Sequence, residues 1–388
     1  MVNNILLYGA TGYSGRLIAS EMKLVSEGEP GAYRMILAGR DGGHVRRLAE
    51  ELSMDYRVFG LDDRSAPARE LRGQDVVINA AGPFARTAER LAKVAADEGC
   101  HYVDISGEAD VYMRLDDLDV YARAREVAMV SGAGFWAAAS DTLLDRALQR
   151  LSPMSELGAV RIAMSRIRTF SRGSAATVWR SLREQVTVVR GVRTDDGGSR
   201  LVLWHEPVGK LERIFDFSHS TSRQRDRRIA SAASLIDTLT ARLTAARHKV
   251  FPRTIESYVE MGLARRAAYQ LGASVVPIAA LPIVSALVQQ GLGVLSEGPT
   301  KDERERDNHI ILLEIEDPYS TRIIDWRWET PNVYQFTAQL AVAVATQVAR
   351  NRPAGWLTPA QALAPLNNPS LTGDAGPFRG CLLDERNT

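Results

Sequence analysis

Residues 5–18 read ILLYGATGYSGRLI, and the fold follows from this stretch. Its first four residues form a short apolar run that ends abruptly at a glycine-rich segment. Beyond that segment, Leu17, Ile18 and Met22 recur at the spacing of one helix face. Short apolar runs bounded by turn residues are typical of buried strands. The stretch therefore predicts a strand, a glycine loop and the start of a helix.

Three glycines in this stretch follow the pattern G-x-x-G-x-x-G, a variant of the dinucleotide-binding fingerprint. We expect Gly9 to make the tight turn, Gly12 to let the backbone approach a pyrophosphate, and Gly15 to let the helix pack closely. The positive end of the helix would then face the phosphates. Because the pattern follows a strand and opens a helix, we interpret it as a nucleotide site. Its expected contacts also include Thr11, Tyr13 and Ser14.

The next apolar run, residues 34–38, indicates which nucleotide is bound. In NAD-binding domains the second strand usually ends in an acidic residue that accepts a hydrogen bond from the ribose, whereas arginine suits a 2′-phosphate. Arg40 at this position favours NADP(H). We interpret Arg46 and Arg47 as a solvated helix face rather than as phosphate ligands. Asp41 leaves two alternatives open, a helix cap or tolerance of NAD.

Two later apolar runs end in polar turns. Ligands of doubly wound sheets lie beyond the carboxyl ends of the strands. We therefore expect the turn after residues 74–78 to lie near the ribose and nicotinamide, with contacts from Asn79, Ala81, Gly82 and Pro83.

The run at residues 101–105 leads into Ser106, Gly107 and Glu108. We expect Gly107 to contact the cofactor. Two carboxylates and two hydroxyls here are more than a turn needs, but a cap of the next helix by Ser106 or Glu108 explains them equally well. The candidate proton donors are Tyr102, Asp104, Glu108, Ser140 and Asp141, with no spacing that selects one of them.

Composition excludes several classes of protein. The 388 residues include 48 basic and 47 acidic ones, so there is no basic stripe of the kind that nucleic-acid binders show. Cys100 and Cys381 are too few for a disulfide scaffold and fit a reducing, cytoplasmic setting. Six scattered histidines predict no metal site. We see no signal peptide, because the N-terminus enters the first strand directly.

These motifs together resemble the saccharopine dehydrogenase-like oxidoreductases, and more narrowly the branch that includes trans-acting enoyl reductases of lipid and polyketide assembly. The resemblance implies an α/β protein with an NADP-binding Rossmann domain, a doubly wound parallel sheet, and a second α+β domain. It also implies hydride transfer to a C=N or C=C bond. The motifs are GATGYSGRLIA (9–19), AGRD (38–41), VVINAAGPF (76–84), YVDISGE (102–108) and PAGWLTPAQAL (353–363).

One segment departs from the family pattern. The family commonly carries a Cys followed by G-F-D-S-x-P-S-D, but this chain has Ala133 in place of the Cys. Trp136, Ala137 and Ala139 replace the Asp, Ser and Pro of the loop. The segment is therefore more apolar than in the family. Either the substrate is less polar, or turnover has been lost and the chain is a non-catalytic NADP-binding sensor or assembly partner.

We expect a Rossmann domain over residues 1–135, an α+β substrate or dimerisation domain over 136–330, and a C-terminal helix with a tail over 331–388. In the second domain we expect a helix from Ser174 to about residue 189 and a solvated loop over 217–231. The tail beyond residue 365 reads as loop. The basic residues of the loop could meet a carrier's phosphopantetheine, although a plain surface loop is favoured.

Residues 267–296 contain no charged side chain. This length would cross a bilayer, but prolines, glycines and a Gln-Gln pair interrupt it. We favour core helices or a homodimer contact over a peripheral lipid contact, and a membrane span least. The sequence as a whole thus predicts a cytoplasmic, homodimeric NADPH-dependent reductase of a small or carrier-bound biosynthetic intermediate. It predicts no nucleic-acid partner.

Overall fold

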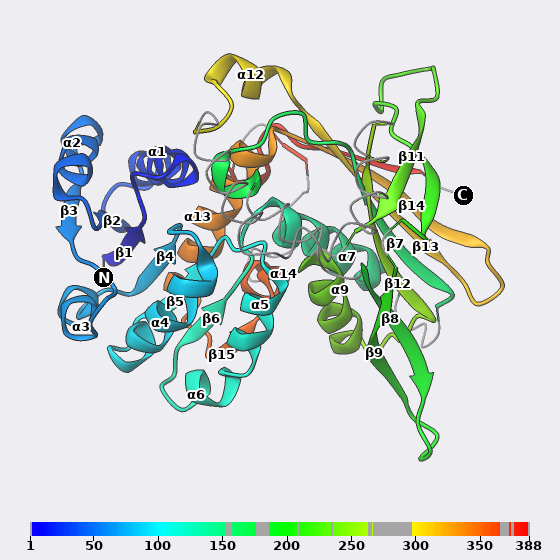
Figure 1. Ribbon diagram of the computed structural model, residues 1–388, viewed down its shortest axis with the longest axis horizontal. Helices are drawn as coiled ribbons and strands as arrows, with labels where there is room; N and C mark the ends of the chain where they lie inside the picture. The colour runs from blue at the N-terminus through cyan, green and yellow to red at the C-terminus, as the bar shows by residue number, and fades with distance from the viewer. Residues whose placement is uncertain are drawn as a thin grey trace, which may run out of the picture. The chain divides into compact units, whose positions relative to one another are not determined.

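The computed structural model describes residues 2–151, 157–175, 186–207, 209–233, 236–262, 266, 297–364, 372–373 and 376–386 (Figure 1). The chain divides into two compact units. The first comprises Met1–Ala139 and Tyr334–Pro369, and the second comprises Ser140–Val333 and Ser370–Thr388. The chain thus crosses between units at 139/140, 333/334 and 369/370. The boundaries expected from the sequence were 135/136 and 330/331.

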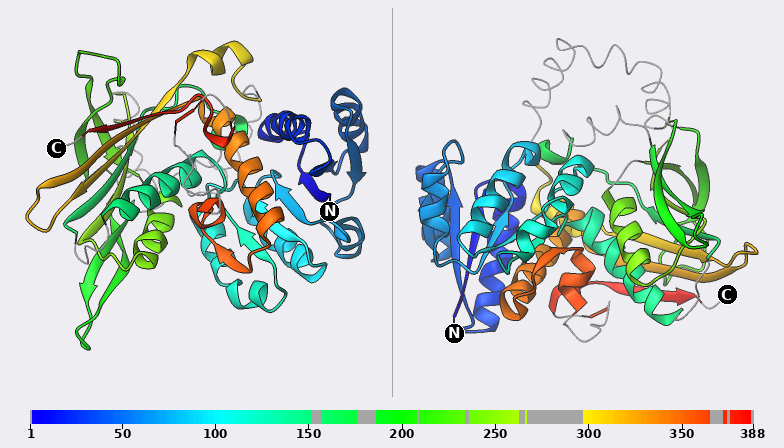
Figure 2. Two further views of the ribbon diagram at one scale, coloured as in Figure 1. Left: turned by 180° about the vertical axis from the view of Figure 1, so that it is seen from behind. Right: turned by 90° about the horizontal axis from the view of Figure 1, so that it is seen from below.

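The first unit is built on a seven-stranded sheet whose neighbouring strands are all parallel. Helices lie on both faces of this sheet (Figures 1 and 2). The strand order is β15 (Gly355–Leu357), β6 (Ala128–Val130), β5 (His101–Asp104), β4 (Val76–Asn79), β1 (Asn3–Tyr8), β2 (Tyr33–Gly39) and β3 (Asp55–Val58). The helices are α1 (Tyr13–Gly28), α2 (Gly42–Leu52), α3 (Ser65–Leu71), α4 (Phe84–Asp97), α5 (Ala109–Asp116), α6 (Asp119–Arg123), α13 (Val333–Asn351) and α14 (Pro359–Leu363).

This strand order is that of a Rossmann sheet, and it confirms the predicted fold class. The central strands are buried on both faces, so they read as unbroken apolar runs rather than alternating ones, as residues 5–8 and 76–78 do. The chain order reverses between β1 and β4, because β2 and β3 lie on one side of β1 and β4 on the other. In such sheets the ligand crevice forms at this point, beyond the carboxyl ends of the two strands.

The second unit is built on a nine-stranded mixed sheet. Its main path is β10 (Glu212–Asp216), β11 (Arg227–Ala232), β12 (Thr254–Glu260), β7 (Ala159–Met164), β13 (His309–Glu316), β14 (Arg322–Thr330) and β16 (Leu382–Arg386). The hairpin of β8 (Val186–Arg193) and β9 (Ser199–Glu206) joins β12 at the side. Helices α7 (Ser140–Arg150) and α9 (Ile236–Arg247) pack together and against the sheet, and α12 (Lys301–Arg306) is a short charged helix with no buried residue. A second sheet-containing unit was predicted, and it is confirmed.

Three expectations for the second unit are wrong in part. The helix expected to run to about residue 189 does not do so, because residues 186–193 form β8 with Val186, Val188 and Val189 buried. The loop expected over 217–231 ends before β11, which begins at Arg227. The tail expected to be loop contains β16, which pairs with β14.

The charge-free stretch 267–296 lies outside the described residues. In the described part of the chain, no helix has the length and apolar character needed to cross a membrane.

Candidate cofactor site

The glycine loop between β1 and α1 is shaped by two close backbone contacts. Gly9 has a φ of +86°, and a Cβ there would lie 2.7 Å from the backbone nitrogen of Ala81. A Cβ at Gly15 would lie 2.1 Å from the carbonyl oxygen of Gly9. Real Cβ atoms do not approach backbone atoms so closely, so the packing of the first unit itself requires glycine at positions 9 and 15. This agrees with the turn and the close helix packing expected from the sequence.

Gly12 is different, because the fold does not require a glycine there. Its φ of −68° suits any residue, and a Cβ would meet only the Gly9 carbonyl oxygen, at an ordinary 3.4 Å. Gly12 is also exposed. Because the fold does not explain this glycine, we keep the role expected from the motif, in which the absence of a side chain lets a phosphate approach the backbone.

The N-terminus of α1 lacks a side-chain cap. Gly12 occupies the cap position, no side chain accepts a hydrogen bond there, and the first turn carries no acidic residue. In contrast, Asp41 caps α2 by accepting the N–H of His44 at 3.0 Å. Uncapped amides at a helix N-terminus favour a bound anion. A pyrophosphate therefore fits this end of α1.

Arg40 lies exposed directly after β2 and makes no ion pair or hydrogen bond with a described residue. The positive charge of Arg40 acts on Tyr8 at the end of β1. Burial raises the pKa of Tyr8, and the nearby Arg40 lowers it in part. The neighbouring Asp41 is occupied by α2 and by His44, whose ring nitrogen lies 2.7 Å away. Arg46 pairs with Glu50 at 2.9 Å, as expected for a solvated helix face. Arg40 is therefore the available cation at this strand end.

Phe59, in the connection that follows β3, lies near the cofactor site but was not predicted from the sequence. Its ring stacks on Tyr8 with centroids 4.9 Å apart, and its N–H donates to the carbonyl of Gly39 at 3.1 Å. These contacts bring the residues after β3 to the ends of β1 and β2. Nothing in the sequence signalled this, because β3 is short and largely exposed and lacks the apolar run of a central strand.

Asn79 turns its side chain into the protein rather than toward a ligand. It has no exposed surface, and its amide donates to Tyr102 Oη at 3.0 Å and to Thr87 Oγ1 at 3.3 Å. Its carbonyl oxygen accepts the N–H of Ala81 at 3.0 Å. The side chain thus fixes the turn that packs against Gly9. Ala81 in this turn is partly exposed, and Gly82 and Pro83 are exposed.

Tyr102 and Asp104 are brought together, but at a fully buried position. The Tyr102 hydroxyl donates to Asp104 at 3.0 Å. Asp104 also accepts from the Ser131 hydroxyl at 2.8 Å and from the N–H groups of Ser106 and Gly132 at 2.9 and 3.0 Å. Burial raises the pKa of Asp104, and the donated hydrogen bonds only partly offset this. Burial and the nearby Asp104 likewise raise the pKa of Tyr102. This environment favours a role in holding the ends of β5 and β6, and the catalytic assignments stay predictions.

Glu108 caps a helix, although not the one that the sequence suggested. Its carboxylate accepts the N–H groups of Phe84 and Ala85, at 3.3 and 3.2 Å, at the start of the preceding helix α4. Gly107 beside it is half-buried, and nothing in the structure tests its contact with a cofactor. Asp141 belongs to the second unit, where it is fully buried and accepts a hydrogen bond from Thr244. The candidate donors therefore belong to two different units of the chain.

The segment that departs from the family pattern is apolar and largely buried. Residues 135–139 form a π-helical turn, η1 (Phe135–Ala139), in which Trp136 is half-exposed and contacts the Phe135 ring edge-on at 5.7 Å. The N–H of Phe135 donates to Thr337 Oγ1 of α13 at 3.0 Å. The segment is thus held by the C-terminal helix of the same unit. In the described ranges, no group of His, Cys, Asp or Glu side chains could hold a metal ion.

Comparison with known proteins agrees with this geometry. Residues 5–130 match the family described as the saccharopine dehydrogenase NADP binding domain. A trans-acting enoyl reductase of Mycobacterium leprae is 33% identical over 110 residues, which cover 27% of this chain and 25% of that protein. The region that matches this chain spans about a third of the length of curated relatives such as the putative trans-acting enoyl reductase Rv2449c of Mycobacterium tuberculosis.

Two solved structures share the fold at low sequence identity. Saccharopine dehydrogenase (L-Glu forming) from Saccharomyces cerevisiae superimposes with a TM-score of 0.60 and 12% identity over the full length of both chains. A homospermidine synthase from Legionella pneumophila in complex with NAD gives a TM-score of 0.55 and 10% identity, covering 100% of this chain and 91% of that one. The predicted family resemblance is confirmed: residues 5–130 form an NAD(P)-binding domain of the saccharopine dehydrogenase family.

Proposed function

We propose that this chain is an NADPH-dependent reductase that transfers hydride to the C=C bond of an enoyl intermediate or the C=N bond of an imine. Its substrate is a small or carrier-bound biosynthetic intermediate. The enoyl alternative is supported by the names of the curated relatives and by the apolar character of residues 133–139. The names describe proteins of which this chain matches only a part, so they support the proposal without deciding it.

The observation that favours NADPH over NADH is which of the two side chains after β2 already has a partner. Arg40 is exposed and unpaired in the described part of the chain, whereas the Asp41 carboxylate is occupied at the N-terminus of α2. An acidic residue held in a helix cap is poorly placed to accept from a ribose hydroxyl. A free guanidinium supplies the planar, charged donor that suits a phosphate.

Each residue that contacts the cofactor would have a separate task. The uncapped amides at the start of α1 bind the pyrophosphate, and Arg40 binds the 2′-phosphate. The turn of Ala81, Gly82 and Pro83 lies beside the glycine loop and is held by Asn79. NADPH supplies the hydride when bound, and the protein contributes orientation and exclusion of water.

A fluorescence titration of NADPH and NADH against an Arg40→Ala variant tests this proposal. We expect the variant to bind NADPH about tenfold or more weakly, because one charge-assisted hydrogen bond to phosphate is lost. NADH affinity should be nearly unchanged. Arg47→Ala is the matched control, because it removes another exposed and unpaired arginine from the adjacent helix. An equal loss of affinity for both cofactors would contradict the assignment of Arg40.

Turnover is tested separately by following NADPH oxidation against a panel of enoyl thioesters and imines. Consumption on one class would establish the reductase and select the bond that is reduced. Binding of NADPH without consumption on either class would instead favour a non-catalytic sensor or assembly partner, the alternative that the altered 133–139 segment raises.

A further inference from the structure

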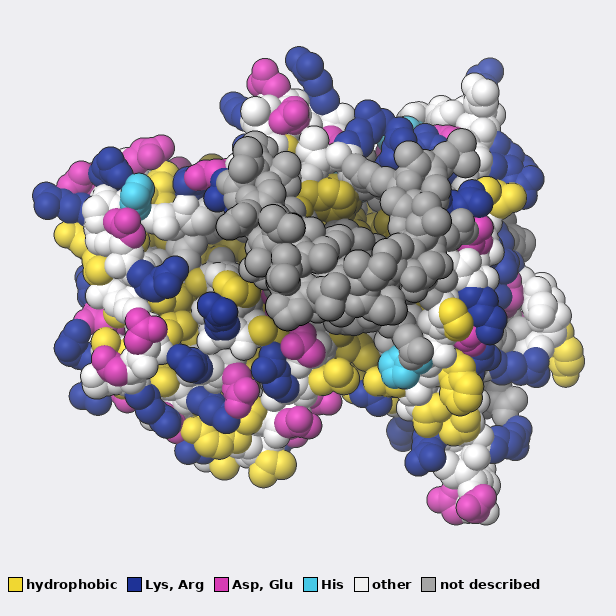
Figure 3. Space-filling model, viewed as in Figure 1, with side chains coloured by type: hydrophobic (Ala, Val, Ile, Leu, Met, Phe, Trp, Pro, Cys, Tyr) yellow, Lys and Arg dark blue, Asp and Glu magenta, His cyan; other side chains and the backbone are white. Residues whose placement is uncertain are grey.

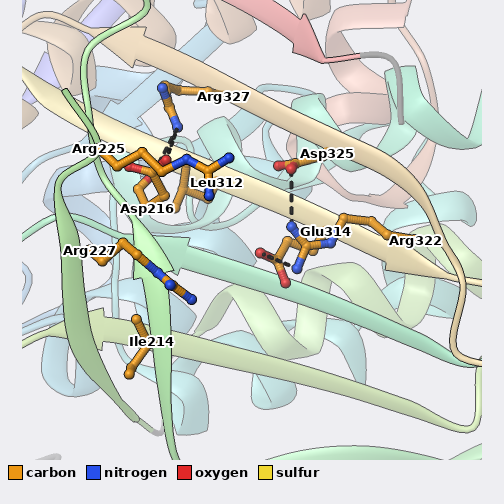
Figure 4. A pocket seen from close by; sticks show the side chains of 9 residues that line it. All are labelled: Ile214, Asp216, Arg225, Arg227, Leu312, Glu314, Arg322, Asp325 and Arg327. Carbon is orange, nitrogen blue, oxygen red and sulfur yellow. Dashed lines mark hydrogen bonds and ion pairs between the residues drawn. The ribbon is translucent and has the colours of Figure 1, made fainter. Parts of the chain in front are cut away.

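The second unit contains a polar cavity of about 180 Å³ between the β10–β11 hairpin and strands β13 and β14 (Figure 4). Arginines and carboxylates dominate its walls. The lining residues are Ile214, Asp216, Arg225, Arg227, Leu312, Glu314, Arg322, Asp325 and Arg327.

The three carboxylates of the cavity already have partners. Glu314 and Asp325 each lie 3.0 Å from Arg322, which bridges them. Asp216 accepts the N–H groups of Ser218 and Asp226, at 3.1 and 3.0 Å. Burial raises the pKa of Asp216, but these hydrogen bonds outweigh it and hold the pKa at about 2. Asp216 therefore stays charged at neutral pH. Burial raises the pKa of Glu314, which nearby Arg322 counteracts only in part. All three carboxylates are engaged with partners inside the second unit.

Two arginines of the cavity have no such partner. Arg225 and Arg227 are exposed, and their guanidinium groups make no ion pair or hydrogen bond in the described part of the chain. Arg227 is the first residue of β11, and Arg225 lies two residues before it in the loop between β10 and β11. Figure 4 shows both extending from the hairpin toward the cavity. Figure 3 shows dark blue basic side chains gathered around β11.

The loop that carries Arg225 is fixed to the sheet. Its base is closed by the N–H of Phe217, which donates to the carbonyl of Asp226 at 2.8 Å. Arg327 is only 2% exposed and donates to Ser218 Oγ at 3.2 Å and to the carbonyl of Asp216 at 2.8 Å. A fixed loop loses little conformational entropy when a ligand binds, so the backbone that carries Arg225 is preorganised.

We propose that this cavity binds the phosphate group of a phosphorylated ligand through Arg225 and Arg227. Two unpaired guanidinium groups match the charge of a dianion better than that of a single carboxylate, and their planar forks suit phosphate oxygens. A volume of about 180 Å³ suits a phosphate group but not a whole nucleotide. The site goes beyond the proposed reductase activity and does not depend on it.

The test is ³¹P NMR of inorganic phosphate mixed with the full chain. Saturating NADPH is present so that the N-terminus of α1 does not compete for phosphate. The parent protein is compared with the double variant Arg225→Ala/Arg227→Ala. Arg223→Ala is the matched control, because Arg223 is an exposed, unpaired arginine of the same loop that does not line the cavity. Thermal unfolding checks that all three proteins are folded.

We expect phosphate to bind the parent and the control alike, and the double variant about tenfold more weakly. Equal binding by all three proteins, or none by the parent at millimolar phosphate, would overturn the proposal. Competition by succinate at the same concentration as by phosphate would also overturn the proposal, because it would show that the site does not select phosphate over a dicarboxylate. Because the comparison is between variants, its result does not depend on whether NADPH binds.

Coenzyme A and pantetheine, which lacks phosphate, then distinguish two sources of the same group. Selective broadening of a coenzyme A phosphate signal, without binding of pantetheine, supports a phosphate carried on a coenzyme. Equal binding of inorganic phosphate and coenzyme A supports a free phosphorylated ligand.

Discussion

Two alanine substitutions in the β1–α1 loop should separate cofactor binding from folding. Gly15→Ala adds a Cβ at 2.1 Å from the Gly9 carbonyl oxygen and 2.8 Å from that of Ala10. Both oxygens belong to the backbone and cannot rotate away, so α1 must move by roughly 1 Å relative to the loop to restore ordinary contact. Overpacking of this kind costs about 1–3 kcal/mol or more of unfolding free energy.

Gly12→Ala should have the opposite profile. Its backbone is already in a conformation that alanine adopts, and the nearest atom to the new Cβ is 3.4 Å away. Glycine-to-alanine changes at such positions stabilise by about 0.4–1 kcal/mol through the unfolded state. The same methyl group occupies the space through which a pyrophosphate approaches. We therefore expect unchanged or raised stability together with an NADPH affinity that falls by about tenfold or more.

The assay pairs a thermal unfolding curve with a nicotinamide fluorescence titration for each variant. Gly28→Ala is the control, because Gly28 ends the same helix with open space around it. Each kcal/mol of destabilisation should lower Tm by roughly 2–4 °C in a unit of this size. Normal NADPH affinity in Gly12→Ala would refute the assignment of this loop, and an undisturbed Tm in Gly15→Ala would refute the packing argument.

Three further substitutions test buried polar groups. Asp237, fully buried at the start of α9, has one carboxylate oxygen without a hydrogen-bond partner in the described residues, and burial raises its pKa to about 7. Between about pH 4 and 7 the unfolded state therefore binds fewer protons than the folded state, so the free energy of unfolding falls as pH rises, by up to about 4 kcal/mol. Urea titrations across this pH range should show that Asp237→Asn abolishes the fall. Glu108→Gln should cost about 1 kcal/mol in urea denaturation through the weakened α4 cap, whereas lost turnover at unchanged stability would indicate catalysis. Tyr102→Phe should cost about 1–3 kcal/mol by leaving Asn79 and Asp104 short of a partner, and a drop in kcat without that cost would contradict a positioning role.

The first unit was largely predictable because its signals are local. A parallel sheet buries its central strands completely, so each appears as an apolar run followed by a turn, as residues 76–83 show. The glycine spacing reports backbone geometry directly, and Gly9 and Gly15 have the close contacts that the motif requires. β3 was missed because it lacks the apolar run of a central strand, with only Arg57 shielded from solvent.

The side-chain roles were harder to predict because they depend on distant partners. Asp104 receives hydrogen bonds from Ser131 and Gly132, which are 27 and 28 residues away in sequence. Glu108 caps a helix that begins 24 residues earlier. In the second unit, the β-branched run at residues 186–192 was a usable strand signal, but it was outweighed by the apparent cap at Ser174. The hydroxyl of Ser171 accepts the N–H of Ser174 at 3.2 Å.

The discontinuity of the first unit has a consequence for synthesis on the ribosome. The first unit is interrupted after Ala139 and resumes at Tyr334, so more than two hundred residues follow Ala139 before its last parallel strand, β15, is available. Until then the outer edge of β6 has no partner, and Thr337 is not yet present to receive the N–H of Phe135. Unpaired strand edges are where nascent chains associate wrongly. The nascent first unit is thus exposed to chaperones and to neighbouring chains for as long as the inserted unit is being translated.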